Sequence, residues 1–141
     1  MDKISNSILT VEISEHGAEL QSIKKNGKEY LWQGDAKFWG RRSPVLFPNV
    51  GRVWEDKYRH AGNTYEIGQH GFARLMEHDF VDQTADTIVL ELCANEETLK
   101  KFPFEFRLVS TFTLEGDTVH HTLTVENLDT DTKNCRRRSK R

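Results

Sequence analysis

The chain has 141 residues and a formal net charge of −2, with 30% charged and 36% hydrophobic residues. This length suffices for one domain with a buried core. A slightly acidic balance argues against nucleic-acid binding, which needs a basic face to neutralise phosphates. No stretch approaches the ~20 consecutive apolar residues that cross a bilayer, so no membrane segment is expected.

Strand-like alternation of apolar and polar residues opens the chain. It predicts a strand over 8–13 and, after a break at His16-Gly17, a second strand over 18–23. Asn26-Gly27 favours a type I′ hairpin, because both residues tolerate the positive φ that this turn requires. The return strand is expected over 29–32.

The rest of the chain continues with short strands and tight turns. A second hairpin is expected over 57–67, with its turn at Gly62-Asn63. Helix Glu96–Lys101 is predicted with Asn95 as its N-cap, because its first turn is acidic. Many strands joined by turns indicate an all-β fold, an antiparallel β-sandwich. The remaining strands are expected over 76–82, 87–93, 104–114 and 118–126.

The sandwich domain is expected over residues 1–131, followed by a basic tail over residues 132–141. From Arg136 on, five of the six residues are Lys or Arg. Blocks of like charge repel and seldom order, so this tail is expected to be disordered. Cys93 and Cys135 lack CxxC or Cys/His spacing, and no signal-like apolar segment opens the chain. These features predict a reduced, cytoplasmic protein.

Two segments collect polar and titratable side chains next to turn-forming residues. The first runs from Arg41 to Arg52, and the second is Gln69-His70-Gly71-Phe72-Ala73-Arg74. Imidazole, amide and guanidinium groups on loops carried by a sheet can face a ligand that offers many hydroxyls. A sugar fits that description.

The segment from Phe38 to Arg52, followed by Gln69–Arg74, resembles the aldose 1-epimerase (galactose mutarotase) family. Within it, the bacterial sugar-operon mutarotase-like and hexose-6-phosphate epimerase branch is most similar. The resemblance covers roughly residues 8–131 and implies a galactose mutarotase-like supersandwich with a sugar site on its concave face. Members of the family are considerably longer, so this chain is expected to be a truncated, amino-terminal half with a foreign end.

The resemblance also implies roles for five residues. His70 matches the family's first active-site histidine, which holds and polarises the sugar, and is the catalytic candidate. Arg41, Arg52, Gln69 and Arg74 are the substrate-binding candidates. The family's general acid, a second histidine, and its base, a glutamate near the carboxyl terminus, have no counterpart in this chain. The resemblance implies no metal and no organic cofactor.

Each of these roles has an alternative. His70 could be a loop histidine that bonds only to the backbone, and Arg74 could form an ordinary surface salt bridge. Arg42 beside Arg41 leaves the register of that position open by one residue. Glu55-Asp56 stands where the galactose branch has an Asn-Arg pair, which weakens a specific assignment of Arg52 to galactose binding.

The remaining histidines are expected to be structural. His120 and His121 are adjacent on a strand, so their rings point to opposite faces and cannot chelate one ion together. His16, His60 and His78 are expected on loops or the surface. Among the aromatic residues, Trp39 is best placed by the motif to stack on a sugar.

Together these features predict an aldose 1-epimerase-like protein that binds a hexose or hexose 6-phosphate, whose α and β anomers the family interconverts. The 141-residue chain is expected to be inactive because it lacks the acid and the base. The alternatives are a non-catalytic carbohydrate-binding module and a non-functional fragment. If the chain lacks the second half of the sandwich, its exposed sheet edges would favour self-association. The apolar residues expected to lack cover are Val109, Phe112, Leu114, Val119, Leu123 and Val125.

Overall fold

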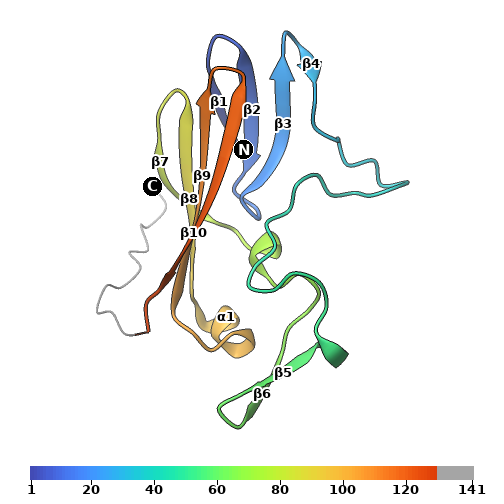
Figure 1. Ribbon diagram of the computed structural model, residues 1–141, viewed down its shortest axis with the longest axis vertical. Helices are drawn as coiled ribbons and strands as arrows, with labels where there is room; N and C mark the ends of the chain where they lie inside the picture. The colour runs from blue at the N-terminus through green and yellow to red at the C-terminus, as the bar shows by residue number, and fades with distance from the viewer. Residues whose placement is uncertain (130–141) are drawn as a thin grey trace.

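The computed structural model describes residues 1–129, in which two four-stranded antiparallel sheets pack as a β-sandwich (Figure 1). The first sheet has the order β1-β2-β3-β4, with β1 Asp2–Ser5, β2 Leu9–Ser14, β3 Glu19–Lys25 and β4 Lys28–Glu29. The second has the order β10-β9-β8-β7, with β7 Asp79–Gln83, β8 Thr87–Cys93, β9 Phe106–Glu115 and β10 Thr118–Asn127. The expected all-β sandwich is therefore confirmed, whereas Cys135 and the predicted tail lie outside the described residues.

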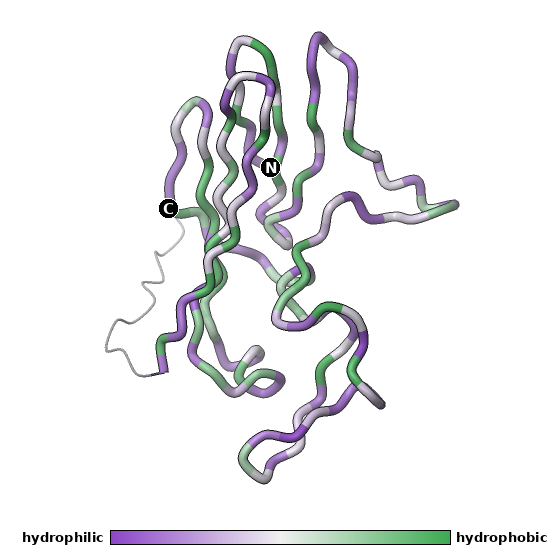
Figure 2. Tube along the Cα trace, in the orientation of Figure 1, coloured by the Kyte–Doolittle hydropathy of each residue, from purple (hydrophilic) through white to green (hydrophobic). Residues whose placement is uncertain are grey.

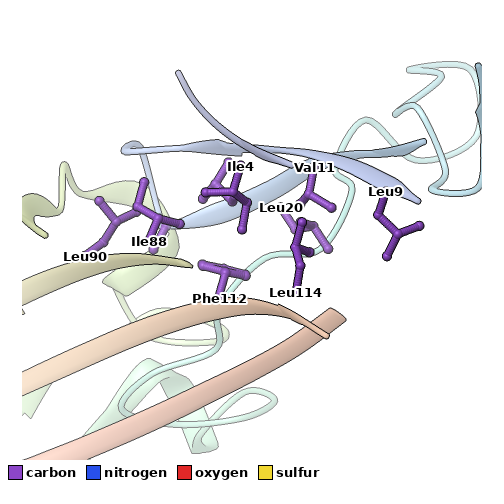
Figure 3. Close-up of a cluster of buried hydrophobic side chains, with 10 residues drawn as sticks. Ile4, Leu9, Val11, Leu20, Ile88, Leu90, Phe112 and Leu114 are labelled. Atoms are coloured by element: carbon purple, nitrogen blue, oxygen red, sulfur yellow. The ribbon is translucent and has the colours of Figure 1, made fainter. Parts of the chain in front are cut away.

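The main core lies between the two sheets because one face of each strand is apolar. Figure 2 shows polar and apolar residues alternating along the chain, and burial alternates in the same way along β2 and β9. Side chains of the first sheet point toward side chains of β8 and β9 (Figure 3). The buried cluster consists of Ile4, Leu9, Val11, Ile13, Ala18, Leu20, Ile88, Leu90, Phe112 and Leu114.

A second apolar cluster anchors the loops that carry the two polar segments. Phe72 and Val45 come from these loops, and Phe106 and Leu108 come from β9. The ring of Phe47 packs at a tilt on that of Phe106, with the centroids 5.1 Å apart. The loops are thus fixed to the end of the second sheet by buried aromatic contacts.

Two hairpins form where turn residues predict them. Asn26 and Gly27 both have positive φ and join β3 to β4, as expected. The second hairpin joins β5 Lys57–His60 to β6 Asn63–Glu66, but its turn is Ala61-Gly62. Asn63 pairs with His60 in the ladder, so the turn lies one residue earlier than the sequence predicts.

Strand boundaries differ from the prediction where the chain pairs with a different neighbour. β7 begins at Asp79 because the residues before it bond to the β2–β3 junction: His78 N–H donates to Glu15 O (2.9 Å), and Glu77 bridges to His16. The return strand β4 is only two residues long. β1 was not expected, because a four-residue strand with one buried side chain gives little periodic signal.

The short helices connect these strands. α1 spans Glu96–Lys101, and the side chain of Asn95 accepts a hydrogen bond from Thr98 N–H (3.0 Å), which confirms the predicted helix and its N-cap. Single 3₁₀ turns occur at η1 Trp54–Asp56 and η2 Ala73–Leu75. Among residues 1–129, no helix is both long and apolar enough to cross a membrane.

β10 is an edge strand whose apolar residues are largely uncovered. Leu123 and Val125 are 49% and 54% exposed. Phe112 and Leu114, by contrast, are buried between the sheets, so the expectation that they lack cover was wrong. The difference arises because β9 lies inside the second sheet and faces the first sheet, whereas β10 is the edge strand and is not covered by the first sheet in the same way.

Candidate functional site

The two polar segments meet through a close backbone contact between Phe47 and Gly71. The Phe47 carbonyl accepts hydrogen bonds from the N–H groups of Phe72 (2.9 Å) and Ala73 (3.2 Å). A Cβ atom on Gly71 would lie 2.1 Å from the same oxygen, and Gly71 has a φ of +66°. Only glycine combines that φ with that approach, so the contact fixes His70 and Arg74 relative to the first segment.

His70 is held by its backbone and by its ring. Its N–H donates to Gly51 O (2.9 Å), and Gly51 N–H donates in return to His70 Nδ1 (2.9 Å). A neutral imidazole has one donor and one acceptor nitrogen. Because Nδ1 accepts, the ring hydrogen lies on Nε2. The ring therefore presents a hydrogen-bond donor on the side away from Gly51.

Gln69 and Asn49 lie beside this histidine. The Nε2 atoms of Gln69 and His70 are 3.3 Å apart. Two N–H donors cannot bond to each other, so the amide orientation that satisfies both turns the Gln69 oxygen toward the ring. Asn49 Nδ2 donates to Gly51 O (3.0 Å) and supports the loop under the ring.

Arg74 and Arg41 are neighbours although they are far apart in sequence. Arg74 NH2 donates to Gln69 O (3.0 Å), and Arg41 NH1 donates to Arg74 O (3.3 Å). The Nε of Arg74 is buried without a hydrogen-bond partner among the described residues. Neither arginine forms an ion pair with a carboxylate of residues 1–129. The salt bridge considered as an alternative for Arg74 is therefore not seen in this part of the chain.

Arg52 differs from the other two arginines because it has a carboxylate partner. Its Nε and NH2 donate to the two oxygens of Asp56 (2.7 and 2.6 Å). The hydrogen bond from the guanidinium lowers the pKa of Asp56 below its usual value. Asp56 thus occupies one edge of the guanidinium, and the second NH group of Arg52 is left for other contacts.

The other histidines lie apart from this cluster. His120 contacts Glu115 (3.2 Å), and His121 stacks on Phe112 with the ring centroids 4.0 Å apart. These separate partners agree with the expectation that the two rings face opposite sides of β10. His78 lies on the connection between η2 and β7, as expected of a loop residue, but it is buried rather than on the surface, with 2% exposed. Its Nε2 donates to Ala73 O (3.0 Å), directly behind the second segment.

Two further contributors to the site carry no recognisable signal in the sequence. Gly51 binds His70 through main-chain atoms, which no side-chain pattern can reveal. The buried Glu19 carboxylate accepts hydrogen bonds from Arg42 N–H and Ser43 N–H in the first segment (both 2.9 Å). Within the part of the chain that is described, no group of three or more His, Cys, Asp or Glu is arranged to hold a metal ion.

Comparison with known proteins defines the class of protein that has this fold and these loops. Residues 3–134 match the family described as aldose 1-epimerase. The chain therefore belongs to the aldose 1-epimerase family.

Particular relatives show how much of a family member is present. Protein LacX of Lactococcus lactis subsp. lactis, in its chromosomal form, is 33% identical in an alignment of 135 residues that covers 92% of this chain and 45% of LacX. A galactose mutarotase related enzyme from Lactobacillus acidophilus is 41% identical, with a TM-score of 0.88 over 89% of this chain and 43% of that one. A galactose mutarotase-like protein from Lactobacillus casei is also 41% identical, with a TM-score of 0.89 over 93% and 45%. The chain thus spans less than half the length of these relatives and corresponds to their amino-terminal half.

Proposed function

We propose that this chain binds a hexose or hexose 6-phosphate in the manner of an aldose 1-epimerase, and that the 141 residues alone do not interconvert its anomers. The observation that carries the proposal is the reciprocal pair of hydrogen bonds between His70 and Gly51. It holds the imidazole in one orientation and one tautomer. His70 Nε2–H can then donate to an oxygen of the sugar, which takes the place of the Gln69 amide oxygen, and polarise it.

Arg41 and Arg74, which have no carboxylate partner within residues 1–129, support a polar, oxygen-rich ligand. Arg41 and Arg74 lie within one hydrogen bond of each other, and Arg74 also bonds to the backbone of Gln69. Guanidinium groups bind vicinal oxygens or phosphate with a planar fork of donors. We assign Arg41, Gln69 and Arg74 to the sugar, with Arg52 contributing through the NH group that Asp56 leaves free.

The proposal that turnover is absent follows from the chemistry of mutarotation. Opening the hemiacetal needs a base for the anomeric hydroxyl and an acid for the ring oxygen, and such catalysis typically contributes ~10²–10⁴-fold. Within residues 1–129, the polar partners of the His70 ring are the Gly51 N–H and the Gln69 amide. Neither can exchange a proton in this way. A single histidine held as a donor positions the sugar without completing the acid–base pair.

The proposed ligand is a small sugar rather than nucleic acid or a membrane surface. The net charge of −2 agrees with this, because nucleic-acid binding needs a positive face. We also propose a cytoplasmic location, because phosphorylated hexoses are cytoplasmic metabolites.

The proposal is tested by calorimetric titration of D-glucose and glucose 6-phosphate into the 141-residue chain and into Arg74→Ala. Losing one partner of a charged hydrogen bond costs ~1.5–3 kcal/mol. We expect Arg74→Ala to bind both sugars more weakly, with a larger loss of affinity for glucose 6-phosphate than for glucose. Lys24→Ala is the control, because this lysine is exposed on β3. Equal affinities of wild type and Arg74→Ala would contradict the assigned role of the arginine, and no binding of either sugar would contradict the function.

A further inference from the structure

We propose that Glu19 is a positioning residue that sets the place of Arg41 in the sugar site, an inference that rests on the proposed function. Glu19 is the first residue of β3 and is 7% exposed. Among residues 1–129 it forms no ion pair. A buried carboxylate without a cation is costly unless hydrogen bonds replace its water.

Those hydrogen bonds come from the first polar segment. Glu19 Oε1 accepts from Arg42 N–H and from Ser43 N–H, each at 2.9 Å. Hydrogen bonds from N–H groups to an ionised carboxylate are stronger than those to a neutral acceptor. Because two successive N–H groups donate to the same carboxylate oxygen, they fix the direction of the backbone that follows Arg41.

The neighbouring backbone holds the second segment at the same junction. Gly17 N–H donates to Met76 O (2.8 Å), and a Cβ atom on Gly17 would lie 2.9 Å from Arg74 O. Arg41 NH1 donates to that same oxygen of Arg74 (3.3 Å). The junction from Gly17 to Glu19 therefore contacts both segments at the point where their arginines meet.

The contacts of Arg42 distinguish it from Arg41. Arg42 NH1 donates to the backbone and side-chain oxygens of Gln21 (3.2 and 2.7 Å), and NH2 donates to Gln33 O (3.3 Å). Arg42 thus ties the loop to β3 with its guanidinium, whereas Arg41 extends toward Arg74. The side chain that Glu19 places for the ligand is that of Arg41.

Glu91 offers a matched control for substitution of a buried glutamate. It is 8% exposed on β8 and bonds to Arg107 Nε (2.6 Å). Glu91→Gln removes a buried negative charge, as Glu19→Gln does, but it disturbs an ion pair between β8 and β9 rather than a site loop. A general loss of stability would affect both variants alike.

The experiment is calorimetric titration of glucose 6-phosphate into wild type, Glu19→Gln, Glu91→Gln, Arg41→Ala and Glu19→Gln/Arg41→Ala, with a thermal melt of each. We expect Glu19→Gln to weaken binding roughly tenfold, as for a weakened charged hydrogen bond. Glu91→Gln should melt at a lower temperature but bind like wild type. Because Glu19 acts through Arg41, the double variant should lose less affinity than the two single losses combined.

The outcomes separate this inference from the proposed function. If Glu19→Gln binds with wild-type affinity, the positioning role is overturned while the function stands. The same holds if the loss of affinity in the double variant equals the two single losses combined. Absence of binding by wild type would overturn both. If Glu19→Gln gives no cooperative melt, Glu19→Asp decides the matter, because it keeps the charge and shortens the reach to Arg42 and Ser43: reduced affinity supports the role, and unchanged affinity overturns it.

Discussion

At His70, an uncommon backbone conformation and a fixed ring tautomer occur in one residue. Its φ is +64°, a left-handed value that few non-glycine residues adopt and that often marks functional sites. The bonds with Gly51 hold that conformation and leave Nε2–H as the donor. The alternative that His70 bonds only to the backbone holds for Nδ1, which accepts from Gly51 N–H. It does not hold for Nε2, which lies beside the side chain of Gln69.

His78 should make the stability of the protein depend on pH. Burial lowers the pKa of His78, and this effect outweighs the hydrogen bond to Ala73 and the nearby carboxylates of Glu77 and Asp79. The folded state therefore binds the proton less readily than the unfolded state, whose histidine titrates near ~6.5. The unfolding free energy should fall as pH drops below that value, by up to ~1.4 kcal/mol per pH unit for this residue.

Chemical denaturation at several pH values between neutral and acidic checks this dependence in wild type and His78→Gln. The glutamine can still donate to Ala73 O but does not titrate, so the slope should decrease. Burial also lowers the pKa of His121, which contributes in the same direction and remains in the variant. An identical slope in both proteins would show that His78 is not the group responsible.

At the level of elements, local signals predicted the parts of the fold that depend on local chemistry. Asn26-Gly27 and the cap Asn95 each define their element through a few adjacent residues. The β7 boundary could not be predicted, because it depends on contacts of His78 and Glu77 with a junction some 60 residues earlier. The same limitation applies to the candidate site: the motifs indicated His70 as a candidate, whereas the hydrogen bonds of Glu19 are seen only in the folded chain.

β10 should associate with β10 of a second copy of the chain. Its outer edge is unpaired among residues 1–129, and Leu123 and Val125 are about half exposed. The strand contains no Lys, Arg or Pro, which commonly protect edges, and Arg107 pairs with its one acidic residue, Glu126. An antiparallel pair of β10 strands would satisfy the edge and cover these apolar side chains without placing lysines against each other.

Sedimentation of wild type, Leu123→Lys and Thr124→Ser at micromolar concentration tests this association. Leu123 shares a face with the buried residues of β9, whereas Thr124 lies on the opposite face of the strand. Wild type and Thr124→Ser should sediment as dimers or larger species, and Leu123→Lys should shift toward monomer. A compact wild-type monomer with a cooperative melt would contradict the association and indicate a self-sufficient domain.

At the scale of the whole molecule, the chain combines a folded sandwich with the loops that we propose bind a sugar. It spans about 45% of the LacX relative and of the Lactobacillus casei structure. Within the described residues, two loops converge on His70, Arg41 and Arg74, and buried contacts to β3 and β9 hold them there. We propose that this part binds the sugar and that anomer interconversion needs groups beyond those assembled around His70.

The most direct test is proton NMR of D-glucose and glucose 6-phosphate in the presence of the 141-residue chain. Saturation transfer to the sugar protons reports binding, and exchange between the α and β anomeric signals reports mutarotation in the same sample. We predict saturation transfer that disappears in His70→Ala, together with anomer exchange no faster than in buffer. Exchange that increases with protein concentration and is lost in His70→Ala would contradict the account, as would an absence of saturation transfer to either sugar.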